Sequence, residues 1–141
     1  MLKTPITVRS LGPDEAHILE KVRAGLCENL DLTRAWALVA TRINELVVAL
    51  DQGEVIGLAY GTMVMHPERP SEFLVSAVTV HENYRRQGIG TRLVERLVDA
   101  GADRGCEAVW MLQEDENEAA AAFCESVGLS RDALHVHRRS V

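Results

Sequence analysis

Two arginines and two glycines stand where an apolar strand gives way to a helix, and this stretch is the part of the chain best suited to chemistry. The apolar run 73–80 has the length of a strand, and Arg85, Arg86, Gly88 and Gly90 follow it. The first N–H groups of a helix have no partner inside the helix and lie at the positive end of its dipole. Glycines carry no Cβ, so a diphosphate can approach these N–H groups, and arginines add positive charge. The pattern predicts a site for phosphate groups built from backbone.

The spacing of these residues matches a family signature. The run from Arg85 to Gly90 fits the pattern Gln/Arg-x-x-Gly-x-Gly/Ala of the GNAT superfamily of acetyl-CoA-dependent N-acetyltransferases, which the chain resembles. The apolar residues on either side of the run match as well. The resemblance implies acetyl-CoA as the acetyl donor and a cofactor site that consists of Val78, Thr79, Val80, Arg85, Arg86, Gln87, Gly88, Ile89, Gly90, Thr91 and Asn117.

A second motif at 117–129 resembles the superfamily pattern Asn-x-x-Ala-x-x-Leu/Phe-Tyr-x-x-x-Gly-Phe. Asn117, Phe123 and Gly128 fit this pattern, and the resemblance implies that Asn117 lies against the pantetheine arm of CoA. The tyrosine that often protonates the departing thiolate in the family is replaced by Cys124. Cys124 is therefore a candidate acid, although a small packed residue is the simpler interpretation. Asn117 also suits a helix N-cap.

A closer resemblance extends over nearly the whole chain. The segments 6–14, 70–72, 85–89 and 134–136 look like the small aminoglycoside 3-N-acetyltransferases of the gentamicin type, although Ala77 stands where that subfamily has an aspartate. The resemblance implies a primary amine of a small cationic acceptor, such as an aminoglycoside. Two other hypotheses stay open. One is a different amine acceptor (an amino acid, a polyamine or a peptide N-terminus), and the other is a CoA-binding domain without transfer activity.

Acetyl transfer to an amine requires a base, because an ammonium group must lose a proton before it attacks. The candidates are Glu72, Asp115 and His135, although a surface residue at a strand edge is the simpler interpretation of Glu72. The thioester carbonyl becomes negative in the transition state, so a backbone N–H in the strand at 78–80 is expected to stabilise it. A splayed end of that strand would leave further N–H and C=O groups free for the pantetheine amides.

The elements that must position these residues follow from hydrophobic patterning. Adjacent strands joined by a turn exclude a purely parallel sheet, and helices after the later strands add parallel crossovers. We therefore expect an α+β fold: one N-acetyltransferase domain over residues 1–141, with a mixed, mostly antiparallel sheet of six to seven strands and helices on both faces. The expected strands are 6–9, 46–50, 55–65, 72–80, 108–112 and 135–138, and the expected helices are 14–27, 30–43, a helix from the glycines to about 104, and 117–126.

Composition narrows the class of partner. The 141 residues carry a net charge of −6, which argues against nucleic acid as the main partner. Apolar runs stay well below the roughly 20 residues of a membrane span, and the first residues lack the apolar core of a signal peptide. The three cysteines show no metal-ligand spacing, which favours a reducing, cytoplasmic setting without a metal. We expect a small-molecule amine substrate and, because the superfamily is often dimeric, a homodimer as one candidate assembly.

Overall fold

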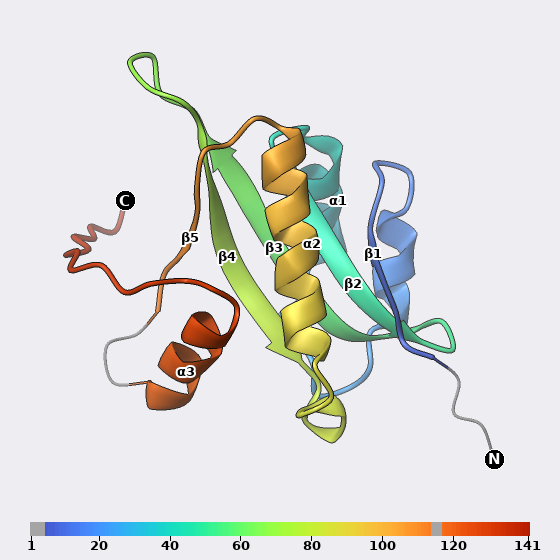
Figure 1. Ribbon diagram of the computed structural model, residues 1–141. Helices are drawn as coiled ribbons and strands as arrows, with labels where there is room; N and C mark the ends of the chain where they lie inside the picture. Colours follow the sequence, from blue (N-terminus) through green and yellow to red (C-terminus); the bar gives the residue numbers. More distant parts are fainter. Residues whose placement is uncertain (1–4, 114–116) are drawn as a thin grey trace.

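The computed structural model describes residues 5–113 and 117–141. Within them a sheet is flanked by helices on both faces (Figure 1). The elements in chain order are β1 (Thr7–Ser10), the 3-10 helix η1 (Ala16–Lys21), α1 (Leu32–Ala40), β2 (Asn44–Asp51), β3 (Glu54–Val64), β4 (Glu72–Val80), the 3-10 helix η2 (Glu82–Tyr84), α2 (Ile89–Asp103), β5 (Val109–Met111) and α3 (Glu118–Ser126).

The sheet follows the order of the chain, β1-β2-β3-β4-β5. The first four strands pair antiparallel, and β5 pairs parallel to β4. A tight turn with Gly53 in the left-handed region, at φ +84°, joins β2 to β3. The parallel pair requires a crossover, which α2 supplies. The mixed, mostly antiparallel sheet is therefore confirmed.

Two apolar cores lie on the two faces of the sheet because the inner strands are apolar on both sides. One face of α2, with Leu93 and Leu97 fully buried, packs on Phe73 and Val75 of β4. The opposite face of the sheet is covered by η1 and α1 (Figure 1). Burial of this kind contributes about 25 cal/mol for each Å² of apolar surface, so the position of α2 on β4 is firmly fixed.

Three expectations about the fold need correction. The described residues form five strands rather than six or seven, because 135–138 is not a strand. Leu134 and Val136 alternate as in a strand, but they are 71% and 72% exposed and pair with no neighbouring strand. The helix expected at 14–27 is only the short η1. It ends because Val22 is extended and forms a bridge with Val55 of β3.

Candidate functional site

The phosphate loop (residues 85–90) follows β4 and η2 and leads into the first residues of α2. Gly88 is the N-cap of α2 with φ +75°, a left-handed conformation that suits glycine. A Cβ at Gly88 would have no atom within 4 Å, and the N-cap contributes no side-chain hydrogen bond to the helix. Arg86 also has a positive φ of 64°, which is uncommon for a residue with a side chain. The loop therefore presents backbone amides and two guanidinium groups at the N-terminus of a 15-residue helix.

In the part of the chain that the structure describes, the second half of β4 has no strand partner on the side away from β3, although Nε of Arg85 donates a hydrogen bond of 3.2 Å to the carbonyl oxygen of Val80. Among the described residues, β4 pairs with β5 only over Phe73–Val75. At the point where this pairing stops, the register with β3 shifts: Gly61 faces Val75 and Tyr60 faces Ala77, which leaves Ser76 as an extra residue. Such a bulge bends the strand and ends pairing. We call the side of Ser76–Val80 that faces away from β3 the open edge. This observation matches the expected splayed strand.

A pocket of about 340 Å³ lies between the phosphate loop and the open edge. Val78 and Val80 of β4 form one wall, and Phe123 of α3 forms another. A Cβ at Gly90 would lie 3.1 Å from the Phe123 ring, so the glycine permits this close approach. The backbone N–H of Ala120 donates a hydrogen bond of 2.9 Å to Oδ1 of Asn117, which caps the helix that carries Phe123.

The structure brings together most of the residues expected at the cofactor site. Thr79 and Gln87 belong to the same segments but do not line the pocket, and Asn117 caps α3 instead. Tyr84 and Phe123 line the pocket, although they were not in the expected set. Phe123 belongs to the second motif and Tyr84 directly precedes the first, so an aromatic residue at each motif was the signal that could have identified them. The expected residues that line the pocket are Val78, Val80, Arg85, Arg86, Gly88, Ile89, Gly90 and Thr91.

The expected catalytic residues lie outside the pocket lining. Glu72 begins β4 at the far end of the strand, where its Oε1 lies 3.2 Å from Nε2 of His66 and 3.2 Å from Nη1 of Arg69. His135 is exposed in the segment after α3. Cys124 lies half-buried on α3, and burial raises the pKa of its thiol, so the thiol stays protonated at neutral pH. Asp115 lies outside the described residues.

Tyr84 lines the pocket, and the pKa of its hydroxyl is raised above the usual value. Its hydroxyl donates a hydrogen bond of 2.5 Å to Oδ2 of Asp51. This hydrogen bond raises the pKa of Tyr84, because the phenol can donate to the carboxylate only while it is protonated. The hydroxyl therefore remains neutral across the range in which proteins normally work.

Residues 5–113 and 117–141 carry neither a cluster of metal-binding side chains nor a helix that could span a membrane. In that part of the chain no group of histidine, cysteine and acidic side chains is arranged to hold a metal ion. None of its helices combines the length and apolar character needed to cross a membrane.

This chain matches an acetyltransferase family model and curated acetyltransferases. Residues 15–129 match the family model described as "Acetyltransferase (GNAT) family". The chain is 31% identical over 84 residues to N-alpha-acetyltransferase 30 of Schizosaccharomyces pombe, a match that covers 60% of this chain and 56% of that protein. It is 38% identical over 57 residues to the [Ribosomal protein bS18]-alanine N-acetyltransferase of Escherichia coli, which covers 40% of this chain and 38% of that protein. The chain thus spans about half or less of the length of these curated relatives.

A solved structure with the same fold is an aminoglycoside acetyltransferase from an uncultured soil metagenomic sample. Its TM-score is 0.83 at 23% identity, and the match covers 98% of this chain and all of that chain. This likeness establishes the fold, including the sheet and the helices on both of its faces.

Proposed function

The chain belongs to the GNAT acetyltransferase family, and we propose that it transfers an acetyl group from acetyl-CoA to a primary amine. The pocket between the phosphate loop and the open edge is the observation that supports this activity best. Unsatisfied amides at a helix N-terminus suit a diphosphate, and an unpaired strand edge suits the amides of a pantetheine arm. The lining of this pocket contains two guanidinium groups and neither carboxylate nor imidazole, which suits an anionic ligand such as a diphosphate.

The residues of the pocket fit acetyl-CoA in a defined order. Gly88 leaves room for the diphosphate, and Arg85 and Arg86 balance its charge. Val78 and Val80 line the path of the pantetheine arm along the open edge. Phe123 closes the pocket on the side of α3 and packs against Gly90.

Acetyl-CoA supplies an activated thioester, and the chain positions it and stabilises charge. A free N–H at 78–80 on the open edge is the proposed donor to the carbonyl oxygen. Since the lining has no base, the ammonium proton leaves through water. Glu72, His135 and Cys124 lie outside the pocket lining, so we expect none of them to exchange a proton directly with the substrate or the departing thiolate.

The first candidate acceptor is a small cationic amine, with an aminoglycoside as the specific example. The net charge of −6 and the resemblance of the segments 6–14 and 134–136 support it. A peptide N-terminus is the second candidate, because the relatives with at least 30% identity include an N-alpha-acetyltransferase and a ribosomal-protein alanine N-acetyltransferase.

The test begins with calorimetry of the whole chain with CoA and acetyl-CoA. Release of the CoA thiol is then measured with gentamicin, spermidine, free amino acids and peptides that begin with alanine or methionine. Turnover with gentamicin supports the first acceptor, and turnover with the peptides alone supports the second. Binding of CoA without turnover on any amine identifies a non-catalytic CoA-binding domain. Absence of CoA binding refutes the proposed function.

A further inference from the structure

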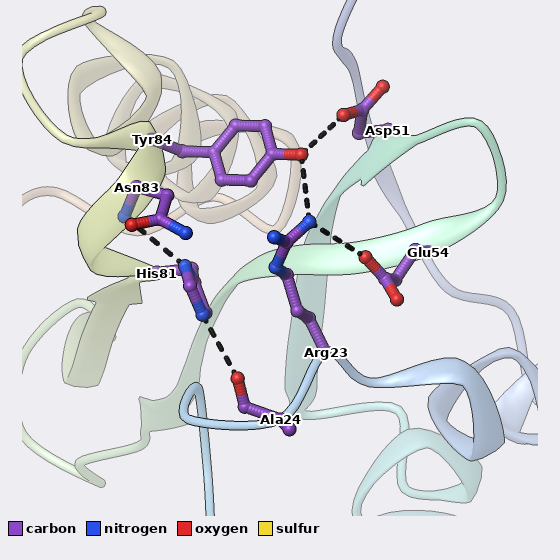
Figure 2. Close-up of polar contacts among 7 residues, drawn as sticks. All are labelled: Arg23, Ala24, Asp51, Glu54, His81, Asn83 and Tyr84. Carbon is purple, nitrogen blue, oxygen red and sulfur yellow. Dashed lines mark hydrogen bonds and ion pairs between the residues drawn. The ribbon is translucent and has the colours of Figure 1, made fainter.

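Tyr84 connects the pocket to two distant parts of the chain (Figure 2). Its ring lines the pocket, while its hydroxyl donates to Asp51 at the end of β2. Nη1 of Arg23 donates to the same hydroxyl at 3.2 Å and to Oε1 of Glu54 at 3.2 Å. The guanidinium carbon of Arg23 lies 5.4 Å from the centre of the Tyr84 ring, which adds a cation–π contact. The hydroxyl is therefore held by two partners, which lie 33 and 61 residues away in sequence.

His81 holds the other end of the same segment. Its side chain is buried, with 7% of the residue exposed. Nε2 lies 2.9 Å from the carbonyl oxygen of Ala24, and Nδ1 lies 3.2 Å from the backbone N–H of Asn83. A carbonyl only accepts and an amide N–H only donates, so these partners require a neutral ring with its proton on Nε2. Segment 81–84 is thus tied to the loop at 23–24 by both of its ring side chains, as Figure 2 shows.

These contacts fix the residues that start the phosphate loop. Tyr84 directly precedes Arg85 and stands two residues before Arg86, whose positive φ requires support from its surroundings. The ion pair of Arg23 with Glu54 and the hydrogen bond of Tyr84 to Asp51 also engage both of these carboxylates. A loop that is held in its binding conformation loses less entropy when an anion binds.

We propose that Tyr84, held by Asp51 and Arg23, is a positioning residue that sets the affinity of the phosphate loop for the diphosphate of CoA. This inference rests on the proposed function, because it assigns a role within the same site. It adds the 23–24 loop and the β2–β3 turn to the structural determinants of cofactor affinity, although both lie outside the two sequence motifs.

The main test compares Tyr84→Phe with the wild-type chain. The variant keeps the ring in the pocket wall and removes only the hydroxyl. The Kd for CoA should rise at least about fivefold, because the hydroxyl makes hydrogen bonds to both Asp51 and Arg23 and the loss of one bond worth about 1 kcal/mol already corresponds to that factor. The KM for acetyl-CoA should rise by a similar factor while kcat stays within about twofold, a split expected for an interaction that contributes only to binding. Tyr60→Phe is the matched control, since Tyr60 is also half-buried but packs in the core on the other face.

A double-mutant cycle separates this role from a general loss of stability. Asp51→Ala should weaken CoA binding like Tyr84→Phe, and the double variant should be no weaker than either single variant, because both remove the same interaction. Asp51→Asn keeps an acceptor oxygen and should restore affinity to within about twofold of the wild type. If Tyr84→Phe does not fold, Arg23→Gln replaces it. Its control is Arg69→Gln, which removes an ion pair of the same 3.2 Å length far from the pocket.

The outcomes are distinct. If the wild-type chain binds CoA and folded Tyr84→Phe or Arg23→Gln binds it equally well, the inference is overturned and the proposed function stands. Additive losses in the double-mutant cycle also overturn it, because they show independent effects. If the wild-type chain itself binds no CoA, the proposed function fails and the inference fails with it.

Discussion

The two halves of β4 perform different tasks. Phe73–Val75 pairs with β3 on one side and β5 on the other, and Phe73 and Val75 are fully buried under α2. Within the described residues, Ala77–Val80 pairs with β3 alone, and this half of the strand contributes Val78 and Val80 to the pocket wall. The same strand is therefore core at its start and binding surface at its end. The difference arises where the pairing with β5 stops. Beyond that point β4 is an edge strand, and an edge strand presents N–H and C=O groups that no neighbouring strand pairs.

The point of separation has a local cause. Ser76 is the extra residue of the bulge, and Gly61 of β3 lies opposite the preceding residue, Val75. A Cβ at Gly61 would lie 2.5 Å from the carbonyl oxygen of Leu74 and 2.5 Å from the Phe73 ring. The bulge thus needs a glycine on the neighbouring strand.

The largest effect is expected at the binding end, from Gly90→Val. The new side chain would fill the space between the phosphate loop and Phe123, where a Cβ alone already comes to 3.1 Å. We expect CoA affinity to fall at least about 100-fold, or about 2.7 kcal/mol, in titration calorimetry. Ala102→Val, at an exposed position of the same helix, is the control and should bind normally. Wild-type affinity in Gly90→Val would contradict the assignment of the pocket.

Gly61→Ala tests the junction between the halves. Because its Cβ would meet backbone and a buried ring, the bulge must shift, and overpacking of this kind costs about 2 kcal/mol. Thermal unfolding should show a fall in Tm of several degrees. Gly12→Ala provides the comparison, since its Cβ would meet only the end of the Glu15 side chain at 3.3 Å. An equal Tm in both variants would argue against a constraint at the bulge.

Arg86→Gln tests the charge at the phosphate loop. It should weaken CoA binding about fivefold at low salt, with a smaller difference at high salt, because screening reduces the contribution of an exposed charge. Arg69→Gln, at the other end of β4, should leave the affinity unchanged. The measurement is CoA affinity at two salt concentrations, and a salt-independent loss would indicate a structural effect instead of a charge effect.

Cys124→Ala should reduce kcat by less than about threefold. Burial raises the pKa of this thiol, so transfer of its proton to a departing thiolate, whose ordinary pKa is about 8.5, is unfavourable. Steady-state kinetics with saturating acetyl-CoA provides the measurement. A loss of about 100-fold or more, the usual contribution of a general acid, would show that the thiol protonates the leaving group.

The smallest effect is expected at the core end, from Glu72→Gln. Its carboxylate pairs with His66 and Arg69 on a partly exposed hairpin, so the variant should lose less than about 1 kcal/mol of stability. Its kcat/KM at neutral pH should stay within about twofold of the wild-type value, because Glu72 lies outside the pocket lining. A large loss of kcat with an unchanged Tm would make Glu72 the base after all.

The sequence alone determined the strand, basic turn and helix from 73 to about 104, and with them most of the pocket lining. Such features are local: hydrophobic periodicity specifies each element, and glycine at 88 permits the left-handed turn. The N-cap at Asn117 could also be predicted from sequence, because a cap involves only residues three positions apart.

Only the tertiary structure decided where β4 leaves β5, why η1 is short and which residues hold Tyr84. The bridge of Val22 to Val55 and the contacts of Tyr84 with Asp51 and Arg23 join residues that are distant in sequence. No local pattern encodes such pairs, because they form only after the sheet has placed its strands and turns side by side. The residues near 135 do not form a strand for the same reason. Alternation of apolar and polar residues is compatible with a strand, but a strand forms only where a neighbouring strand is available for pairing.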